Sequence, residues 1–368
     1  MIAAADARRH LTTIARAPRP AGGTEESAAR DYCAGVLRGQ GFSVSEEPVS
    51  YSGFPGRYAT PLLGGVMAAS IAIAALMAGR GAGGPAIILL VVSLGLVALG
   101  GRWLARDGVL ELPFLREHTR NLVARRGEPR LWIMAHLDSK SQPVPIGVRA
   151  SGLMALGIAW LVALVIAIAA LAGFDVSGNG AFVAVAAVIA AIPVLLSVVG
   201  TRSSGARDNA SGVATVLSTV ERLAPDTPVG VVLTSAEELG LAGARAWVRV
   251  PGRAPGVAIN VDTVDDAGDV QVMYTGGLPA ELAGVITDAG KRVKAKLSVR
   301  RLVPGILTDG VALADAGWQV VTVSKATMRT LARVHTPSDT SEAMTAVGMN
   351  ETAALLADTI ESFTSRGS

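Results

Sequence analysis

The chain has 368 residues, of which half are hydrophobic and only 17% are charged, and its mean hydropathy is positive. This composition is too apolar for a purely soluble enzyme, and the length is sufficient for two domains. A formal net charge of +3, without any basic stretch interleaved with aromatic residues, excludes nucleic acid as an expected partner.

The chain is expected to begin with two amphipathic helices, over residues 2–16 and 24–40. Cys33, the only cysteine, lies on the apolar side of the second helix and cannot form an internal disulfide, which is consistent with a reducing compartment. Residues 43–52 then have the pattern of a strand, and the turn residues 53–56 end it.

Four long runs of the sequence carry no charged residue: 61–79, 81–101, 150–174 and 181–200. At about 1.5 Å per residue, a helix of this length crosses a hydrocarbon core of about 30 Å. The connections within each pair of runs are short, so we expect two transmembrane hairpins, 58–101 and 150–200, with four transmembrane helices in all. The alternative is four buried helices in a large soluble core, which explains uncharged runs of this length less well.

The remaining segments, 1–57, 102–149 and 201–368, are expected to form one catalytic domain. Strand-like and helical patterns alternate in them, with strands at 121–125, 130–135, 229–234, 256–261, 269–275 and 319–324, and helices at 210–223, 240–249, 279–293 and 341–363. This alternation predicts an α/β fold in which helices flank both faces of a largely parallel, mixed sheet. Each hairpin returns to the side of the membrane that it left, so the three segments can complete one domain.

Acidic and histidine side chains lie where three of the predicted strands end: His136, Asp138, Glu237, Glu238 and Asp262. The carboxyl ends of parallel strands are where open α/β sheets gather ligands. Asp208, at the start of a predicted helix, adds a carboxylate that can bridge two cations, and His335 adds a second imidazole. Together these side chains form a ligand set for two divalent metals.

Five short motifs in this order make the resemblance to a known family specific. They are His136-x-Asp138, Asp208-Asn209-Ala210-Ser211-Gly212, Glu237-Glu238, Asn260-x-Asp262 and His335-Thr336-Pro337-x-Asp339. The chain resembles the M28 family of di-zinc metallopeptidases, which includes bacterial aminopeptidases. The resemblance covers nearly all of the sequence outside the four uncharged runs, and it implies a zinc-exopeptidase-like fold.

The resemblance implies two zinc ions per chain that share one ligand. One ion would be held by His136, Asp208 and Asp262. The other would be held by Asp208, Glu238 and His335. Imidazole and carboxylate suit zinc, and two ions about 3.5–4 Å apart can share a carboxylate and a water. Each residue alone has a simpler explanation, such as a structural histidine at a strand end, but the full set favours the metal site.

Two further carboxylates receive catalytic roles. Metal coordination lowers the pKa of bound water towards about 7, which provides a metal-bound hydroxide as nucleophile. Glu237, next to a ligand but not needed as one, would act as general base; its alternative is a surface carboxylate. Asp138 would accept the second N–H of His136 and so fix the tautomer of that imidazole.

Two departures from the family pattern affect substrate handling. Many family aminopeptidases have a tyrosine, placed to stabilise the oxyanion, just before the last histidine, and here that position is Val334. Tyr274 is a possible substitute. Where the family often has Ser-Asp-His, this chain has Thr308-Asp309-Gly310.

The expected function is hydrolysis of peptide bonds by a membrane-embedded aminopeptidase, with a peptide or protein N-terminus as substrate and the lipid bilayer as surroundings. Two alternatives remain open. One is a glutaminyl-cyclase-like zinc acyltransferase, an activity that shares this architecture and uses one zinc ion. The other is a non-catalytic membrane scaffold, although relatives of that kind usually lack ligands and this chain lacks none.

The location of the site follows from chain length and charge. The second hairpin begins 14 residues after His136 and ends 8 residues before Asp208, so we expect the metals to lie close to the bilayer surface. Only one basic residue, Arg80, lies in the turns on the opposite side of the spans. The spans are flanked on the catalytic side by Arg57, Arg102, Arg106, Lys140, Arg149, Arg202 and Arg207. The charged first 20 residues do not resemble a secretory signal peptide. The positive-inside rule therefore predicts a multi-pass bacterial cell-membrane protein whose catalytic domain faces the cytosol.

Overall fold

The structure is a computed structural model that describes residues 6–366, so that the predicted helical residues 2–5 lie outside the described part. The chain divides into two compact units. The first contains the described residues up to Ser52, then Leu112–Ser141, and the described residues from Thr201 onwards. The second contains Gly53–Glu111 and Gln142–Gly200.

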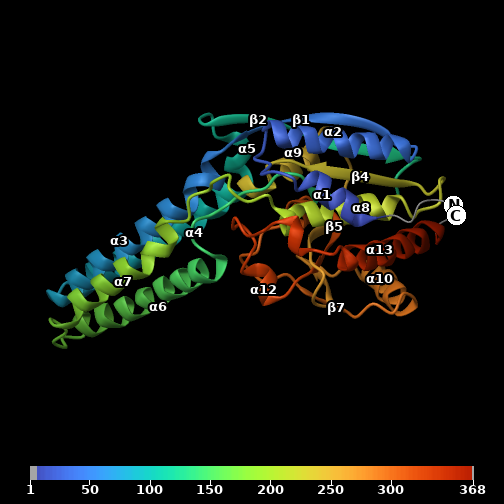
Figure 1. Cartoon of the computed structure of the whole chain (residues 1–368). Helices are drawn as coiled ribbons and strands as arrows, with labels where there is room; N and C mark the ends of the chain where they lie inside the picture. The colour runs from blue at the N-terminus through green and yellow to red at the C-terminus, as the bar shows by residue number, and fades with distance from the viewer. Residues whose placement is uncertain (1–5, 367–368) are drawn as a thin grey trace. The chain divides into compact units, whose positions relative to one another are not determined.

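The first unit is built on an eight-stranded mixed sheet with the order β1-β2-β4-β3-β5-β8-β6-β7 (Figure 1). The strands are β1 (Ser43–Ser52), β2 (Arg116–Arg126), β3 (Trp132–His136), β4 (Val229–Thr234), β5 (Val257–Val264), β6 (Val270–Tyr274), β7 (Leu297–Arg301) and β8 (Gln319–Lys325). The four central strands β4, β3, β5 and β8 are parallel. Strand β2 is antiparallel to both of its neighbours, and β6 is antiparallel to β8.

Alternate side chains of the central strands enter two different cores. Ile133 and Ala135 of β3 belong to the larger core, whereas Met134 between them belongs to a smaller core that also contains Trp247 and Trp318. Successive side chains of a strand point to opposite faces, so a strand that is apolar throughout must be covered on both sides. The expectation of helices on both faces is therefore confirmed.

The helices of this unit form two layers. Helices α8 and α13 pack on β5, with α1 and α10 beside them, whereas α9 and α11 contact strands from the other face. The helices are α1 (Ala7–Ile14), α2 (Thr24–Gly39), α8 (Ser211–Val220), α9 (Ala242–Val248), α10 (Ala280–Arg292), α11 (Asp309–Asp315), α12 (Met328–Leu331) and α13 (Val347–Ser365). Every residue of α8 is buried, which matches its place between the sheet and its neighbouring helices.

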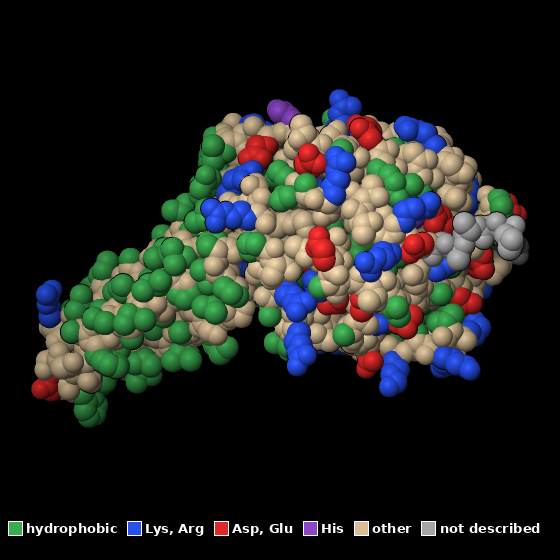
Figure 2. Space-filling view, viewed as in Figure 1, with side chains coloured by type: hydrophobic (Ala, Val, Ile, Leu, Met, Phe, Trp, Pro, Cys, Tyr) green, Lys and Arg blue, Asp and Glu red, His purple; other side chains and the backbone are tan. Residues whose placement is uncertain are grey.

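The second unit consists of four apolar helices and the short turns at their ends. They are α3 (Thr60–Gly79), α4 (Gly83–Trp103), α6 (Ile146–Leu171) and α7 (Asn179–Leu195), with the short α5 at Val109–Glu111. Figure 2 shows hydrophobic side chains over the visible face of these helices. Leu99 of α4 and Phe182 of α7 are 71% and 78% exposed. Many other large apolar side chains of these helices are also exposed, as is typical of a surface that faces lipid.

Small residues let these helices approach one another closely. The core of the unit is rich in alanine, and added Cβ atoms at Gly83 or Gly180 would collide with backbone carbonyls of α6 or α3. Lipid tails are as apolar as leucine, so helices in membranes associate largely through such close packing. The buried residues of the unit therefore fit a bundle in a bilayer.

Three of the four expected spans are long enough to cross a membrane: Pro55–Gly79, Gly83–Glu111 and Ile146–Leu171. The fourth, α7, has 17 residues, because the helix ends at Leu195, soon after the internal Pro193. At about 1.5 Å per residue it reaches about 25 Å, short of the 30 Å core. Four full transmembrane helices are thus not confirmed, and the predicted run 181–200 is helical only as far as Leu195.

Two other elements differ from the sequence-based expectations, one strand and the start of one helix. Strand β7 was not expected, and four of its five residues are exposed. Such an edge strand lacks the alternation of buried and exposed residues that would have indicated it. The helix expected over 341–363 begins only at Val347, because Ala346 has a positive φ of 70°.

Candidate metal centre

Three neighbouring strands bring the predicted ligands to one edge of the sheet. His136 is the last residue of β3, and Asp262 lies in the last part of β5. Glu237 and Glu238 open a short helical turn, η4 (Glu237–Leu239), just beyond β4. Because β4, β3 and β5 are parallel neighbours, their carboxyl ends coincide. The irregular pairing of β5 between Val261 and Val264 re-aims Asp262, as bulges beside active sites do.

Asp208 reaches this edge from the turn η3 (Ala206–Ala210), which precedes α8. The next residue, Asn209, follows a cis peptide bond and is fully buried. Its side chain donates to the carbonyl of Val261 at 2.8 Å and accepts from the amides of Gly212 and Thr263 at 2.9 and 3.1 Å. A Cβ at Gly212 would collide with this amide group. The motif around Asp208 therefore anchors the turn to β5.

The two oxygens of Asp208 face two different imidazoles. Oδ1 lies 3.1 Å from Nε2 of His136, and Oδ2 lies 2.9 Å from Nε2 of His335. Asp262 Oδ1 lies 4.0 Å from the His136 nitrogen, and Glu238 Oε1 lies 3.2 Å from the His335 nitrogen. The structure thus brings all five predicted ligands together.

These contacts divide the five residues into two triads in which the ligand atoms lie within 4.8 Å of one another. One triad is His136, Asp208 and Asp262, and the other is Asp208, Glu238 and His335. Asp208 belongs to both. Among the described residues, Glu238 Oε1 and both ring nitrogens of His335 are buried without a hydrogen bond. Buried polar atoms normally have partners, so these atoms fit the ligands of a cation.

The electrostatics of these side chains show the same need for positive charge. Burial, with Asp208 nearby, raises the pKa of Asp262 to about 7. Burial by itself lowers the pKa of His136, but Glu237, Asp138 and Asp208 raise it well above its usual value. A divalent cation would reverse these shifts, because it favours the ionised carboxylates and the neutral imidazoles that bind it.

Asp138 holds a different position from the one expected. Its carboxylate accepts hydrogen bonds from the backbone amides of Glu237 and Glu238, both at 3.1 Å. The Nδ1 atom of His136 lies 3.1 Å from the backbone carbonyl oxygen of Asp138, and 3.6 Å from its carboxylate. The carbonyl therefore orients the imidazole, and the carboxylate orients the turn η4.

Glu237 lies beside the two triads without belonging to either. Its Oε2 is 3.8 Å from Nε2 of His136, and the residue is only 7% exposed, so it is no surface carboxylate. Burial, together with the neighbouring carboxylates Glu238 and Asp262, raises its pKa well above the usual range although His136 opposes this. A carboxylate with a raised pKa is suited to accept and return a proton near neutral pH.

Other buried residues support the site, and the sequence indicated them only weakly. Asp339 accepts from the amides of Arg207 and Asp208 at 2.8 and 3.3 Å, so it positions the candidate shared ligand Asp208. Arg19, fully buried, donates to the carbonyls of Leu137 and Gly205 and so connects the two loops that carry His136 and Asp208.

Sequence reasoning assigned no site role to Lys140 or Asp309. Lys140 Nζ lies 2.7 Å from Glu238 Oε2. Asp309 at the start of α11 is buried and accepts a short hydrogen bond from Thr234 at the end of β4. Neither belongs to one of the five motifs, although Asp309 lies at the position where the family often has Ser-Asp-His.

Tyr274 does not substitute for the missing tyrosine at Val334. It pairs with Val321 near the start of β8, whereas Val270 at the other end of β6 pairs with Lys325. Since β8 is parallel to β3 and β5, Tyr274 lies towards the amino ends of these strands, away from the metal ligands. Its ring packs against the larger core.

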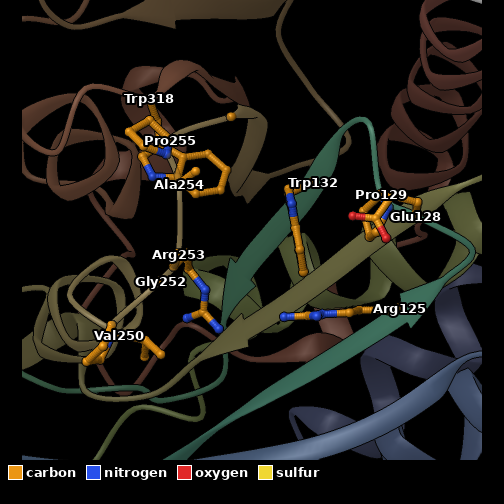
Figure 3. A pocket seen from close by; sticks show the side chains of 12 residues that line it. Arg125, Glu128, Pro129, Trp132, Val250, Gly252, Arg253, Ala254, Pro255 and Trp318 are labelled. Carbon is orange, nitrogen blue, oxygen red and sulfur yellow. The ribbon is translucent and has the colours of Figure 1, made fainter.

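A separate pocket of about 470 Å³ lies at the amino ends of the central strands (Figure 3). Its lining includes Trp132, Arg125 and Trp318, and the Arg125 guanidinium stacks 5.5 Å from the Trp132 ring. Arg253 on its wall forms a two-contact ion pair with Glu47, at 2.7 and 3.1 Å. Glu128 is the one residue of its lining that could ligate zinc, whereas a zinc site uses at least three protein ligands.

Comparison with known proteins agrees with this geometry. No curated protein matches the chain by sequence. Solved structures that share its fold include an aminopeptidase from Aneurinibacillus sp. strain AM-1, with a TM-score of 0.56, 15% identity and coverage of 98% of this chain and 94% of that chain. The zinc aminopeptidase BSAP from Bacillus subtilis (TM-score 0.55, 13% identity, 97% and 94%) and glutaminyl cyclase from Bacteroides thetaiotaomicron (TM-score 0.57, 14% identity, 98% and 98%) are two others. A model described as "Peptidase family M28" matches residues 121–360, more than half of the chain. The protein therefore belongs to peptidase family M28.

Proposed function

We propose that this protein is a membrane-embedded di-zinc metallopeptidase that removes residues from the amino terminus of peptides. The observation that carries this proposal is the position of Asp208, whose two oxygens each face one imidazole at about 3 Å and so match a bridging ligand. Each imidazole has a second carboxylate beside it, which completes three ligands per ion. Family membership and the zinc aminopeptidases among its structural neighbours support the same conclusion.

The two triads would hold zinc ions, whose chemistry when bound would be to polarise the scissile carbonyl and to lower the pKa of a water. The protein's own residues then move the proton. Glu237 accepts it from the attacking water and returns it to the amine that leaves. Asp138 keeps the Glu237 backbone in place through the hydrogen bond to its amide. This division leaves Glu238 as ligand and Glu237 as base, although the two are adjacent in sequence.

A glutaminyl cyclase activity is the second candidate, because such cyclases are among the structural neighbours. The full set of five ligands with a shared Asp208 favours two ions and hydrolysis. Metal analysis separates the two: about two zinc ions per chain with peptide cleavage supports the peptidase. About one ion with a pyroglutamate product supports the cyclase. A chain that binds no metal supports a scaffold.

The membrane location rests on the second unit. Three of its helices have the length and hydropathy to cross a bilayer, and their outward side chains are apolar. The basic residues that flank the spans favour, by the positive-inside rule, a cytosolic side for the metal centre. We therefore propose that the substrates are peptides or protein termini at the inner membrane surface.

The test uses the full chain, purified in detergent, dialysed against chelator and reloaded with zinc or cobalt. The loaded protein should release the amino-terminal residue from aminoacyl arylamides or short peptides, and chelator should abolish this. A protein that carries two metal ions but is inert towards a broad peptide library would refute the proposal.

A further inference from the structure

Lys140 forms an ion pair with one of the residues assigned here as metal ligands. It lies four residues beyond His136, in the loop that follows β3, and its Nζ is 2.7 Å from Glu238 Oε2. The same nitrogen lies 3.5 Å from the backbone carbonyl oxygen of Glu238. The Lys140 side chain is 18% exposed and that of Glu238 is 3% exposed, so the pair is largely shielded from water.

The two oxygens of Glu238 therefore have separate partners. Oε1 lies 3.2 Å from Nε2 of His335 and makes no hydrogen bond among the described residues. Oε2 faces Lys140. The backbone of Glu238 is itself held by the Asp138 carboxylate at 3.1 Å, which fixes the point from which the Glu238 side chain extends. One oxygen of Glu238 is thus directed into the triad and the other away from it.

This division matters for catalysis because a catalytic metal must keep a coordination position for water or substrate. A carboxylate can offer a metal either one oxygen or two. If Glu238 offered both, the second oxygen would occupy a position that the substrate carbonyl needs. A cation that reserves Oε2 prevents this, and it also balances charge in a site with several carboxylates.

We propose that Lys140 is a positioning residue that restricts Glu238 to one metal-ligating oxygen and so keeps a coordination position open. The inference rests on the proposed di-metal peptidase function. Loss of the Lys140 charge should therefore change the coordination of the bound metal as well as the turnover.

The experiment compares the wild type with Lys140→Met, which removes the charge, and Lys140→Arg, which retains it. Lys140→Gln is a second neutral variant in case Lys140→Met does not fold. Lys325→Met is the matched control, because Lys325 Nζ also lies 2.7 Å from a glutamate oxygen, that of Glu351, and this ion pair lies outside the site. Each protein is loaded with cobalt, and its metal content, visible absorption, kcat and KM for an aminoacyl arylamide are measured.

Lys140→Met should retain two cobalt ions, because removal of a positive charge does not weaken cation binding. Its d–d absorption should weaken, as it does when cobalt gains a ligand. Its kcat should fall about 10- to 100-fold, the usual cost of losing a residue that orients a metal ligand, while KM changes little. Lys140→Arg and Lys325→Met should keep the wild-type spectrum and most of the turnover.

A Lys140→Met protein with the wild-type spectrum and kcat would overturn the inference, and so would one that loses a metal ion. In both cases a wild type that binds two ions and hydrolyses peptides would leave the proposed function intact. A wild type that binds no metal would instead refute both.

Discussion

The carboxylate of Asp138 accepts a hydrogen bond from the backbone amide of Glu237 at 3.1 Å. The two residues are 99 positions apart, and the bond connects the loop after β3 with the turn after β4. The other oxygen of Asp138 accepts from the amide of Glu238. The buried carboxylate of Asp138 thus positions both the proposed base and a proposed ligand. The backbone carbonyl of Asp138 orients His136.

Asp138→Asn should lower kcat about 10- to 100-fold and leave the metal content unchanged. The amide group can accept only one of the two backbone N–H bonds, so the turn that carries Glu237 shifts. Activity and bound zinc would be measured together. Asp288→Asn serves as control, because Asp288 is half-buried on α10 and pairs locally with Lys291. Loss of a zinc ion from Asp138→Asn would show that Asp138 acts mainly through the ligands.

Glu237→Gln should lower kcat by at least about 100-fold, because the amide cannot accept the proton from the attacking water. Both metal ions should remain bound, since Glu237 belongs to neither triad. Metal analysis and single-turnover hydrolysis check the two halves of this prediction. Near-normal turnover would remove Glu237 from the role of general base.

Removal of the ligands should reduce the metal content in a pattern that identifies the shared residue. His136→Ala and His335→Ala each remove a ligand from one triad only, so each should retain about one tightly bound ion. Asp208→Ala removes a ligand from both and should weaken both ions. Titration with zinc checks the stoichiometry, and equal losses in all three variants would contradict a bridging Asp208.

Glu26 should make the stability of the protein depend on pH. It is fully buried beneath the η4 turn, where it accepts hydrogen bonds from Ser235, Thr119 and the amide of Gly22. Burial raises its pKa from 4.5 to about 7. The folded protein therefore binds this proton more tightly than the unfolded chain, so Glu26 stabilises the fold below about pH 4.5 and loses that contribution as the pH rises to about 7.

The measurement compares thermal unfolding midpoints of the metal-free wild type and Glu26→Gln in detergent, from pH 4.5 to 8. The midpoint of the wild type should fall relative to that of the variant, by an amount equivalent to at most about 3 kcal/mol. A constant difference between the two proteins over this range would show that the Glu26 pKa is ordinary.

The orientation in the membrane is tested with two reporter fusions. One is placed at Ser368, which lies outside the described residues, and one at Gly178 in the turn before α7. Alkaline phosphatase should be inactive at Ser368 and active at Gly178, because the enzyme folds only outside the cytosol. The reverse pattern would place the metal centre outside the cell.

The sequence by itself determined the class of fold and indicated the candidate metal ligands. Apolar strands that each end in His136, Glu238 or Asp262 indicate both the parallel core and the edge at which ligands meet, because both depend on local patterns. The four uncharged runs indicated the helical unit for the same reason. The end of α7 near Pro193 was less predictable, since the run stays apolar beyond the helix.

Tertiary structure alone decided how each polar atom is used. Contacts between distant segments decide which oxygen of Asp208 faces His136. They also decide that the Asp138 carboxylate binds the amides of η4 rather than the imidazole, and that Lys140 pairs with one oxygen of Glu238. Such hydrogen bonds depend on distances of a few tenths of an ångström and on the direction of lone pairs. No residue pattern along the chain encodes these quantities, because they arise only when the strands and loops have packed.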